Sequence, residues 1–227
     1  VHSYGEVIVS PWGFTDRERN PNWDAYKRLV DKIANFNGYE HSTSTLSTFM
    51  YEVSGDTVDF FHGKAGVASL LFEIGDEFLQ DCYTFDNEIV EDNLSALFYA
   101  AKISRKPFLT TAGIDVKDIS LSNRGVVSSG QTLYVDIEME GKNIFSTPAK
   151  DIRLFLDAHP YDRPLPAEPI MMSRTLPGRA STRLDTTGLD EGRHRICIEV
   201  TDRKMSKGAV TCAFFQVRSI RDRFDAN

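Results

Sequence analysis

Residues 67–75 constrain the fold of this chain more than any other stretch. They read Val-Ala-Ser-Leu-Leu-Phe-Glu-Ile-Gly between Gly66 and Gly75, which predicts a strand buried on both faces. Glu73 falls where this strand ends, and burial of a carboxylate is costly unless a partner or a solvent-filled cleft receives it. Open α/β sheets bind ligands beyond the carboxyl ends of their strands. Glu73 is therefore the first candidate for chemistry; the alternative is a strand-end Glu satisfied by an Arg or a main-chain amide.

The first half of the chain alternates strand and helix patterns. Residues 6–13 form a short β-type run. Apolar spacings of three and four predict an amphipathic helix over residues 23–36, which Gly38 ends. A second helix is predicted over residues 87–102 before Pro107, with one apolar stripe: Ile89, Val90, Leu94, Leu97, Phe98 and Ala101. This order is half of an α/β layer structure.

Past Pro107 the pattern changes to short alternating runs separated by closely spaced turns. Such a pattern predicts an all-β, immunoglobulin-like sandwich. We therefore expect two domains, residues 1–110 and residues 111–227, with the boundary near residues 108–116. Strands are predicted at residues 119–121, 132–138, 152–157, 182–185, 194–201 and 209–217.

The three cysteines, Cys82, Cys197 and Cys212, show no spacing that would build a thiolate metal site. Pairing the predicted hairpin of residues 195–217 about its polar turn puts Cys197 opposite Cys212. A disulfide there would indicate an oxidising compartment, so a secreted or periplasmic protein. Two free, half-buried thiols are the alternative.

Charge and hydropathy limit the partners. Residues 1–110 hold 9 Lys and Arg against 17 Asp and Glu, while the rest holds 17 against 16, so nucleic acid is an unexpected partner. No apolar segment approaches the roughly 20 residues of a membrane helix, so no membrane partner is expected either. The first residues carry neither an initiator Met nor a leader, and we expect the chain to start inside a longer protein.

Three pieces of the first half carry a resemblance to a known family. They are His2-Ser3-Tyr4 followed by Ser-Pro-Trp-Gly at 10–13, then Tyr51 ahead of Ser-Gly-Asp-Thr-Val-Asp at 54–59, then Phe72-Glu73-Ile74. Their order and spacing resemble the C-terminal part of the catalytic domain of zinc carboxypeptidases of the A/B/T type, over residues 1–107. Residues 82–102 resemble the last helix of bacterial secreted members, and the second half, especially residues 187–195, resembles the β-sandwich appended to some of them.

The resemblance implies part of an α/β/α layer domain, a zinc cofactor and the release of C-terminal amino acids from a peptide or protein substrate. It implies that His2 is the third zinc ligand, that Ser3 and Tyr4 line the substrate-peptide subsites, and that Tyr51 is the mobile tyrosine over the bound C-terminus. It also implies that Glu73 is the general base, which accepts a proton from the attacking water and returns it to the leaving amine.

The same mapping implies that Val58 lies in the specificity pocket, where basic-specific relatives tend to carry an acid. An apolar Val favours hydrophobic or aromatic C-terminal residues, since a charged side chain would lose hydration without a partner. Asp56 leaves two alternatives open. It reaches the pocket rim and admits some Lys or Arg, or it bonds its own main chain as turn aspartates do.

The chain also departs from the family. A working site needs two more zinc ligands from a His-x-x-Glu motif and an arginine/asparagine group for the substrate carboxylate, and in the family these precede the position of His2. The other histidines show no metal-ligand spacing to an acid in the first half: His41, His62, His159 and His194. We therefore expect this piece to be inactive alone and to need the missing N-terminal part of the catalytic domain as its partner.

The alternative is a degenerate, non-catalytic peptide-binding module whose sandwich serves adhesion or docking. The presence of His2, Tyr51 and Glu73 together argues against it, because a module without a metal has no use for all three. A third reading keeps the zinc fold with another substrate, such as a cell-wall peptide. For the sandwich, the expected role is to buttress the catalytic domain.

Overall fold

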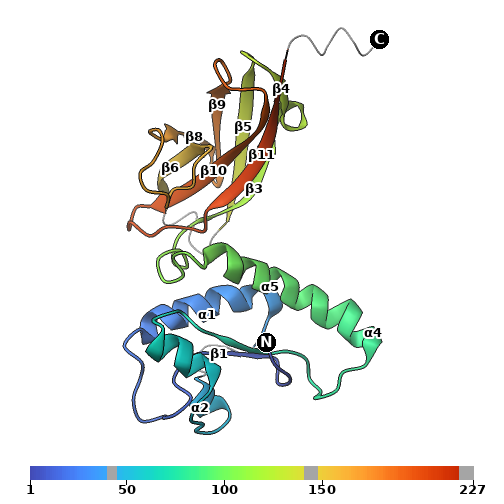
Figure 1. Ribbon diagram of the computed structural model, residues 1–227, viewed down its shortest axis with the longest axis vertical. Helices are drawn as coiled ribbons and strands as arrows, with labels where there is room; N and C mark the ends of the chain where they lie inside the picture. Colours follow the sequence, from blue (N-terminus) through green and yellow to red (C-terminus); the bar gives the residue numbers. More distant parts are fainter. Residues whose placement is uncertain (40–44, 141–147, 220–227) are drawn as a thin grey trace. The chain divides into compact units, whose positions relative to one another are not determined.

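The computed structural model describes residues 1–39, 45–140 and 148–219 of the 227-residue chain (Figure 1). The chain forms two compact units, Val1–Thr111 and Ala112–Asn227. The first carries helices around a small sheet, and the second is built from strands. His41 lies outside the described residues.

The sheet of the first unit is an antiparallel pair of short strands. β1 (Val7–Val9) pairs with β2 (Leu71–Glu73), and Val7 lies opposite Glu73. The prediction of a strand over residues 67–75 is wrong in length, because β1 offers only three residues to pair with and Val67 is 53% exposed. The end of the strand at Glu73 and its burial are as predicted.

Helix α1 (Trp23–Asn37) confirms the prediction made from its spacing. It buries Tyr26, Leu29, Val30, Ile33 and Ala34. Gly38 ends it in the left-handed conformation, φ 73°, and donates its N–H to the carbonyl of Ala34. α1 packs side by side with α5 (Val90–Ile103), as Figure 1 shows.

The apolar stripe predicted for the helix over residues 87–102 is only partly right: Ile89 is buried, but farther along the helix the buried positions lie one residue away from Leu94 and Leu97. The helix buries Asn93, Ala96, Tyr99 and Ile103, whereas Leu94 is 46% and Phe98 66% exposed. One position rotates a helix by about 100°. Counting apolar residues missed the true face because two of its members, Asn93 and Tyr99, are polar and are buried with partners inside the unit, Tyr39 and Phe36.

Shorter helical segments complete the first unit. They are α2 (Leu46–Phe49), α3 (Thr57–Asp59), a π-helical turn (Phe60–Lys64), α4 (Cys82–Thr84) and a second π-helical turn (Phe85–Ile89) that leads into α5. Among the described residues, no helix has both the length and the apolar character needed to cross a bilayer.

Two sheets form the second unit, and their facing apolar residues make its core. One sheet has the order β4 (Val126–Ser128), β11 (Thr211–Arg218), β10 (Gly192–Asp202), β6 (Ala149–Leu156), β7 (Ile170–Met171). The other has the order β3 (Asp115–Leu121), β5 (Thr132–Glu140), β9 (Arg179–Asp185), β8 (Ser173–Leu176). Apart from the short strands β4 and β7, this is the ABED/CFG division of strands in immunoglobulin-type sandwiches.

Each predicted strand of the second half overlaps an observed one. β5 alternates strictly between exposed and buried residues, which is the period-2 pattern that made it recognisable. The sequence did not predict three strands: β4, β7 and β8. Each is two to four residues long and pairs with one longer strand at the edge of its sheet. All four residues of β8 are exposed, so no alternation marks it.

The β10–β11 hairpin contains a disulfide between Cys197 and Cys212, which lie directly opposite each other. The predicted register is thus confirmed, and the alternative of two free thiols is wrong. Cys197 is fully buried on the outer side of its sheet, where it packs with Phe155, Ala158 and Val210. Cys82 is an exposed free cysteine.

His194 ties the start of β10 to the segment after β6. Its Nδ1 lies 2.7 Å from a carboxylate oxygen of Asp157, its Nε2 lies 2.8 Å from the carbonyl oxygen of Asp190, and its ring stacks on Phe215. Neither oxygen can donate, so only the protonated ring, in which both nitrogens are donors, makes both hydrogen bonds. The hydrogen bond to Asp157 raises the pKa of His194 above its ordinary value of 6.5.

This geometry predicts a pH dependence for the stability of the second unit. Because the folded pKa of His194 is above the unfolded value, its contribution is fully present below the unfolded pKa and is lost as the pH rises through the folded pKa. The urea midpoint of the second unit should therefore decrease as the pH rises above 6.5, the ordinary pKa of the imidazole, and through the raised pKa of the folded state. His194→Gln should flatten this slope; an equal slope in the variant contradicts the assignment.

Candidate functional site

Glu73 lies at the centre of a small strand arrangement. Val7 of β1 pairs with one edge of Glu73, and His2 forms a parallel bridge with the other. The N–H of His2 donates to the carbonyl of Phe72 at 2.8 Å, and the N–H of Ile74 donates to the carbonyl of His2 at 2.9 Å. Glu73 thus has hydrogen-bonded main chain on both sides, and it is 2% exposed. The pairing also places His2 directly beside Glu73.

The side chains of His2 and Glu73 are in contact. Nδ1 of His2 lies 3.3 Å from Oε2 of Glu73 and 2.8 Å from the carbonyl oxygen of Ser3. A carbonyl only accepts, so Nδ1 carries the proton and, in the neutral ring, Nε2 holds the lone pair. The imidazole is 65% exposed and the carboxylate 2%. The pair thus presents an accessible nitrogen above a buried acid, an arrangement suited to moving a proton.

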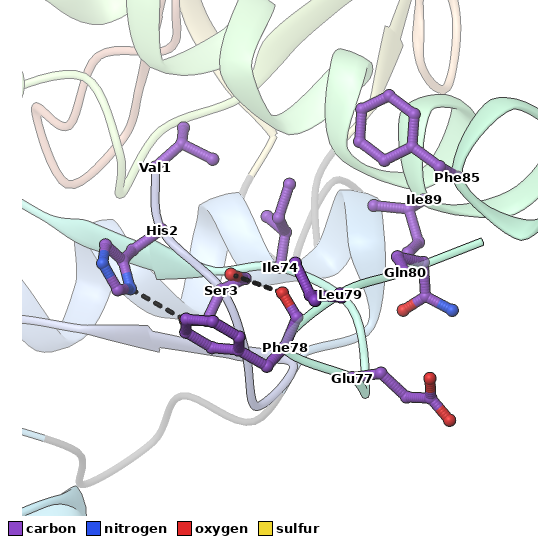
Figure 2. A pocket seen from close by; sticks show the side chains of 10 residues that line it. All are labelled: Val1, His2, Ser3, Ile74, Glu77, Phe78, Leu79, Gln80, Phe85 and Ile89. Carbon is purple, nitrogen blue, oxygen red and sulfur yellow. Dashed lines mark hydrogen bonds between the residues drawn. The ribbon is translucent and has the colours of Figure 1, made fainter. Parts of the chain in front are cut away.

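A cavity of about 430 Å³ begins at His2 and Ser3 (Figure 2). Its other walls come from the segment after β2 and from the start of the α5 region: Ile74, Glu77, Phe78, Leu79, Gln80, Phe85 and Ile89, together with Val1. Six of these ten residues are apolar, and His2, Ser3, Glu77 and Gln80 supply polar groups, a mixture found in small-molecule pockets. Phe78 and Leu79, exposed apolar residues just after Gly75, are a signal that sequence reasoning left unused.

Ser3 and Tyr4, the two residues predicted to line the peptide subsites, both meet Phe78. The hydroxyl of Ser3 donates to the carbonyl of Phe78 at 3.4 Å. The ring of Tyr4 lies edge-on to the ring of Phe78, with centroids 6.4 Å apart. Ser3 belongs to the wall of the cavity, and Tyr4 is 52% exposed. The structure thus brings His2, Ser3 and Glu73 together, with Tyr4 next to them.

Tyr51, Val58 and Asp56 lie on another segment of the unit. Tyr51 follows α2 and is 64% exposed, while Val58 on α3 is 2% exposed. Asp56 caps α3: its Oδ1 accepts the N–H of Asp59 at 2.9 Å. The observed contact of Asp56 is therefore the main-chain bond of a turn aspartate. Within the described ranges, no hydrogen bond or ion pair joins these three residues to His2 or Glu73.

Asp59 is a structural acid that the sequence reasoning missed. Its carboxylate accepts the N–H groups of Gly13 and Phe14 at 2.9 to 3.0 Å, which fixes the turn after residues 10–12. Burial raises the pKa of Asp59 from its ordinary value, and the neighbouring Asp56 raises it further, against the lowering effect of the Gly13 and Phe14 hydrogen bonds. A Cβ at residue 13 would lie 2.7 Å from Oδ2 of Asp56, so a larger residue there would displace that side chain.

The described residues do not by themselves fit a catalytic zinc ion. Such an ion takes three protein ligands and keeps one open position. His2 and Glu73 are one imidazole and one buried carboxylate, and over residues 1–39, 45–140 and 148–219 no group of three His, Cys, Asp or Glu side chains lies together for a metal. Zinc binding by His2 would need ligands from outside this set.

An exposed imidazole in contact with a buried carboxylate, beside a cavity lined by apolar and polar residues, has the elements of an acid–base site. Residues 1–96 match a model of the zinc carboxypeptidase family. The matched stretch contains every residue of the predicted site. No curated protein matches the chain.

The similar solved structures are distant. The fibronectin(III)-like modules of CbhA from Clostridium thermocellum are 13% identical, over 48% of this chain and 49% of theirs, with a TM-score of 0.34. The endo-β-1,4-mannanase from Thermotoga petrophila is 14% identical, over 65% of this chain and 30% of its own, with a TM-score of 0.32. The chain spans about half the length of the CbhA structure.

Proposed function

We propose that residues 1–110 are the C-terminal part of the catalytic domain of a zinc carboxypeptidase, which releases C-terminal amino acids from peptides. The observation that carries the proposal is the contact of 3.3 Å between His2 and Glu73, two residues 71 positions apart, inside the stretch that the zinc carboxypeptidase model matches. A structural role alone does not require an exposed imidazole that lines a cavity and also contacts a buried acid.

In this proposal Glu73 is the general base. A carboxylate within hydrogen-bond reach of the attacking water accepts its proton and then gives it to the leaving amine. Burial at 2% exposure suits this role, because few competing waters reach the acid. Ser3 and Tyr4, which both contact Phe78, line the subsites for the substrate chain on the amino-terminal side of the bond that is cut.

Tyr51 and Val58 serve the C-terminal residue of the substrate. Tyr51, 64% exposed, is free enough to close over the bound C-terminus. Val58 makes the specificity pocket apolar, which favours hydrophobic or aromatic residues. Oδ1 of Asp56 accepts the main-chain N–H of Asp59, while Oδ2 is buried without a hydrogen-bond partner among the described residues. Asp56 therefore adds acceptance of Lys or Arg only if Oδ2 reaches the substrate.

Zinc is the cofactor of the complete enzyme, and His2 is one of its ligands. The described residues offer too few donors, and the sequence holds no His-x-x-Glu motif, so this proposal takes the remaining ligands and the arginine for the substrate carboxylate from another part of the catalytic domain. The chain alone is therefore inactive, and its partner is the N-terminal part of the catalytic domain.

The second unit is an accessory domain of a secreted or periplasmic protein. The disulfide between Cys197 and Cys212 supports such a compartment, because disulfides persist where the surroundings are oxidising. It closes a hairpin whose strands already pair, so it stabilises the sandwich rather than a site.

Substrate preference tests the proposal. The complete protein with zinc should hydrolyse a peptide with C-terminal Phe at least about 10-fold faster, in kcat/KM, than the matched peptide with C-terminal Lys. A C-terminal amide should not be cleaved, since the free carboxylate is required. Val58→Asp should shift the preference toward Lys, while equal or reversed rates in the unchanged protein contradict the role of Val58.

The second candidate is a non-catalytic peptide-binding module, which the small number of metal donors among the described residues favours. The same assay separates the two. Peptide binding without turnover by the complete protein, at any zinc concentration, supports the module. Turnover that a chelator abolishes and zinc restores supports the enzyme.

A further inference from the structure

The turn that follows Glu73 is held at Gly75 from two sides. The carbonyl of Gly75 accepts the N–H of Gly5 at 2.9 Å, and its N–H donates to the phenol oxygen of Tyr39 at 3.2 Å. Gly75 has φ 71°, and a Cβ there would lie 2.8 Å from Cδ1 of Ile89, so glycine is favoured and a larger residue would be strained. Gly75 thus anchors the chain two residues beyond the candidate base.

The phenol of Tyr39 is held by a buried amide. Nδ2 of Asn93 on α5 donates to the Tyr39 oxygen at 2.7 Å and to the carbonyl of Ile89 at 2.9 Å. Oδ1 of Asn93 accepts from the side chain of Asn37, at the end of α1, at 3.0 Å. Tyr39 is 5% and Asn93 4% exposed. A polar network of this kind is buried only where its hydrogen bonds are made, and then it rigidifies what it joins.

These contacts connect the helices to the site. The strand end is fixed by His2 through main-chain bonds to Phe72 and Ile74, and immediately afterwards by Tyr39 at Gly75. The contact between His2 and Glu73 is long, 3.3 Å, and the imidazole is exposed, so that contact does little to hold the carboxylate. The main-chain hydrogen bonds on either side of Glu73 are therefore its firmer anchors.

We propose that Tyr39, held by Asn93, is a positioning residue that fixes the turn at Gly75 and thereby holds the Glu73 carboxylate against the His2 imidazole. The inference rests on the proposed function for its catalytic meaning. The structural part of the proposal is that the phenol oxygen of Tyr39 controls the contact between His2 and Glu73. This part does not depend on catalysis and can be tested on the 227-residue chain.

The test is the NMR resonance of the His2 ring in the 227-residue chain. Glu73→Gln is the reference variant. It removes the negative charge that faces His2, and the chemical-shift change that it causes shows in which direction the His2 ring resonance moves when the carboxylate is lost. Tyr39→Phe keeps the buried ring and removes only the oxygen. It should move the His2 resonance in the same direction by a smaller amount, because the carboxylate is no longer held in place.

Tyr26→Phe is the matched control. The phenol oxygen of Tyr26 also accepts a main-chain N–H, that of Ser69 at 3.0 Å, and it hydrogen-bonds His62. Tyr26→Phe should therefore move the His62 resonance and leave that of His2 in place, whereas Tyr39→Phe should do the reverse. A general loosening of the unit would move both resonances in both variants.

An unmoved His2 resonance in folded Tyr39→Phe overturns the proposal, and so does an unmoved resonance in Glu73→Gln. If Tyr39→Phe does not fold, Asn93→Ala is measured instead, since it removes the amide that holds the phenol; a His2 shift supports the proposal and its absence overturns it. The resonances do not depend on turnover, so these outcomes are separate from those of the substrate assay.

Discussion

Glu73→Gln in the complete protein is expected to lower kcat for peptide hydrolysis about 10²- to 10⁴-fold, with a much smaller change in KM. The amide keeps the size of the side chain and its place at 2% exposure between two strand segments, but it cannot accept the proton of the attacking water. The measurement is steady-state hydrolysis of a peptide with C-terminal Phe across a pH range. The acidic limb of the pH profile, which reports the base, should disappear.

Glu91→Gln is the control for this prediction. Glu91 loses the same charge on substitution, but it is an exposed residue of α5 and does not belong to the wall of the cavity. Its kcat should stay within about 3-fold of the unchanged protein, as expected of a surface carboxylate away from the reacting atoms. Unchanged turnover in Glu73→Gln, or an equal loss in Glu91→Gln, removes Glu73 from the role of base.

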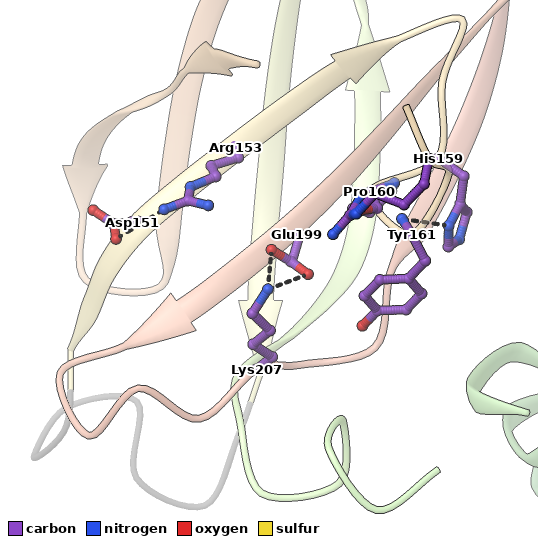
Figure 3. Close-up of polar contacts among 8 residues, drawn as sticks. Asp151, Arg153, His159, Pro160, Tyr161, Glu199 and Lys207 are labelled. Atoms are coloured by element: carbon purple, nitrogen blue, oxygen red, sulfur yellow. Dashed lines mark hydrogen bonds and ion pairs between the residues drawn. The ribbon is translucent and has the colours of Figure 1, made fainter. Parts of the chain in front are cut away.

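The second large effect is expected in the sandwich, at the buried carboxylate of Glu199. This residue is 1% exposed on the outer face of β10, and Nζ of Lys207 contacts its two oxygens at 2.9 and 2.8 Å (Figure 3). Arg153, directly across on β6, is paired with Asp151 at 3.5 Å. Burial, and then the charge of Glu199, raise the pKa of the nearby Tyr161 to about 12.

Lys207→Met should destabilise the second unit by about 3 kcal/mol, because it leaves the buried carboxylate without its cation. The value is at the low end of the range for such pairs, since Lys207 is 29% exposed and water partly screens it. The measurement is urea unfolding of the chain at neutral pH, followed by a probe in the second unit. The double variant Glu199→Leu/Lys207→Met should recover most of the loss, as it removes both charges.

Lys150→Met is the control, since Lys150 is an exposed lysine of the same sheet. It should change stability by less than about 0.5 kcal/mol. If Lys207→Met lowers the free energy of unfolding no more than Lys150→Met does, the contact with Glu199 does not stabilise the folded unit as a buried ion pair. A double variant as unstable as Lys207→Met would place the loss in packing instead of charge.

Local sequence patterns predicted part of the fold. The spacing of Tyr26, Leu29 and Ile33 predicted α1, and the alternation of residues 132–138 predicted β5. The symmetry of the last hairpin put Cys197 opposite Cys212. These patterns are reliable because each residue of an amphipathic element faces either the core or the solvent, and the repeat of 3.6 or 2 residues records which.

Local sequence patterns predicted only part of the candidate site. The end of the strand at Glu73 predicted a carboxylate with an unusual environment, but the environment itself, His2 from the other end of the unit, came from the family resemblance and not from spacing. The length of β2 was mispredicted, since a strand lasts only as far as its partner, and the partner β1 is three residues long.

The sequence by itself determined which residues are apolar, with what period, and in what order the acid, imidazole and tyrosine follow one another. Only the tertiary structure decided that Asn93 is buried, that Tyr39 contacts Gly75 and that Lys207 meets Glu199. The reason is physical. Burial of apolar surface repeats along an element and leaves a periodic pattern, whereas a hydrogen bond or ion pair between single side chains far apart in the chain leaves none.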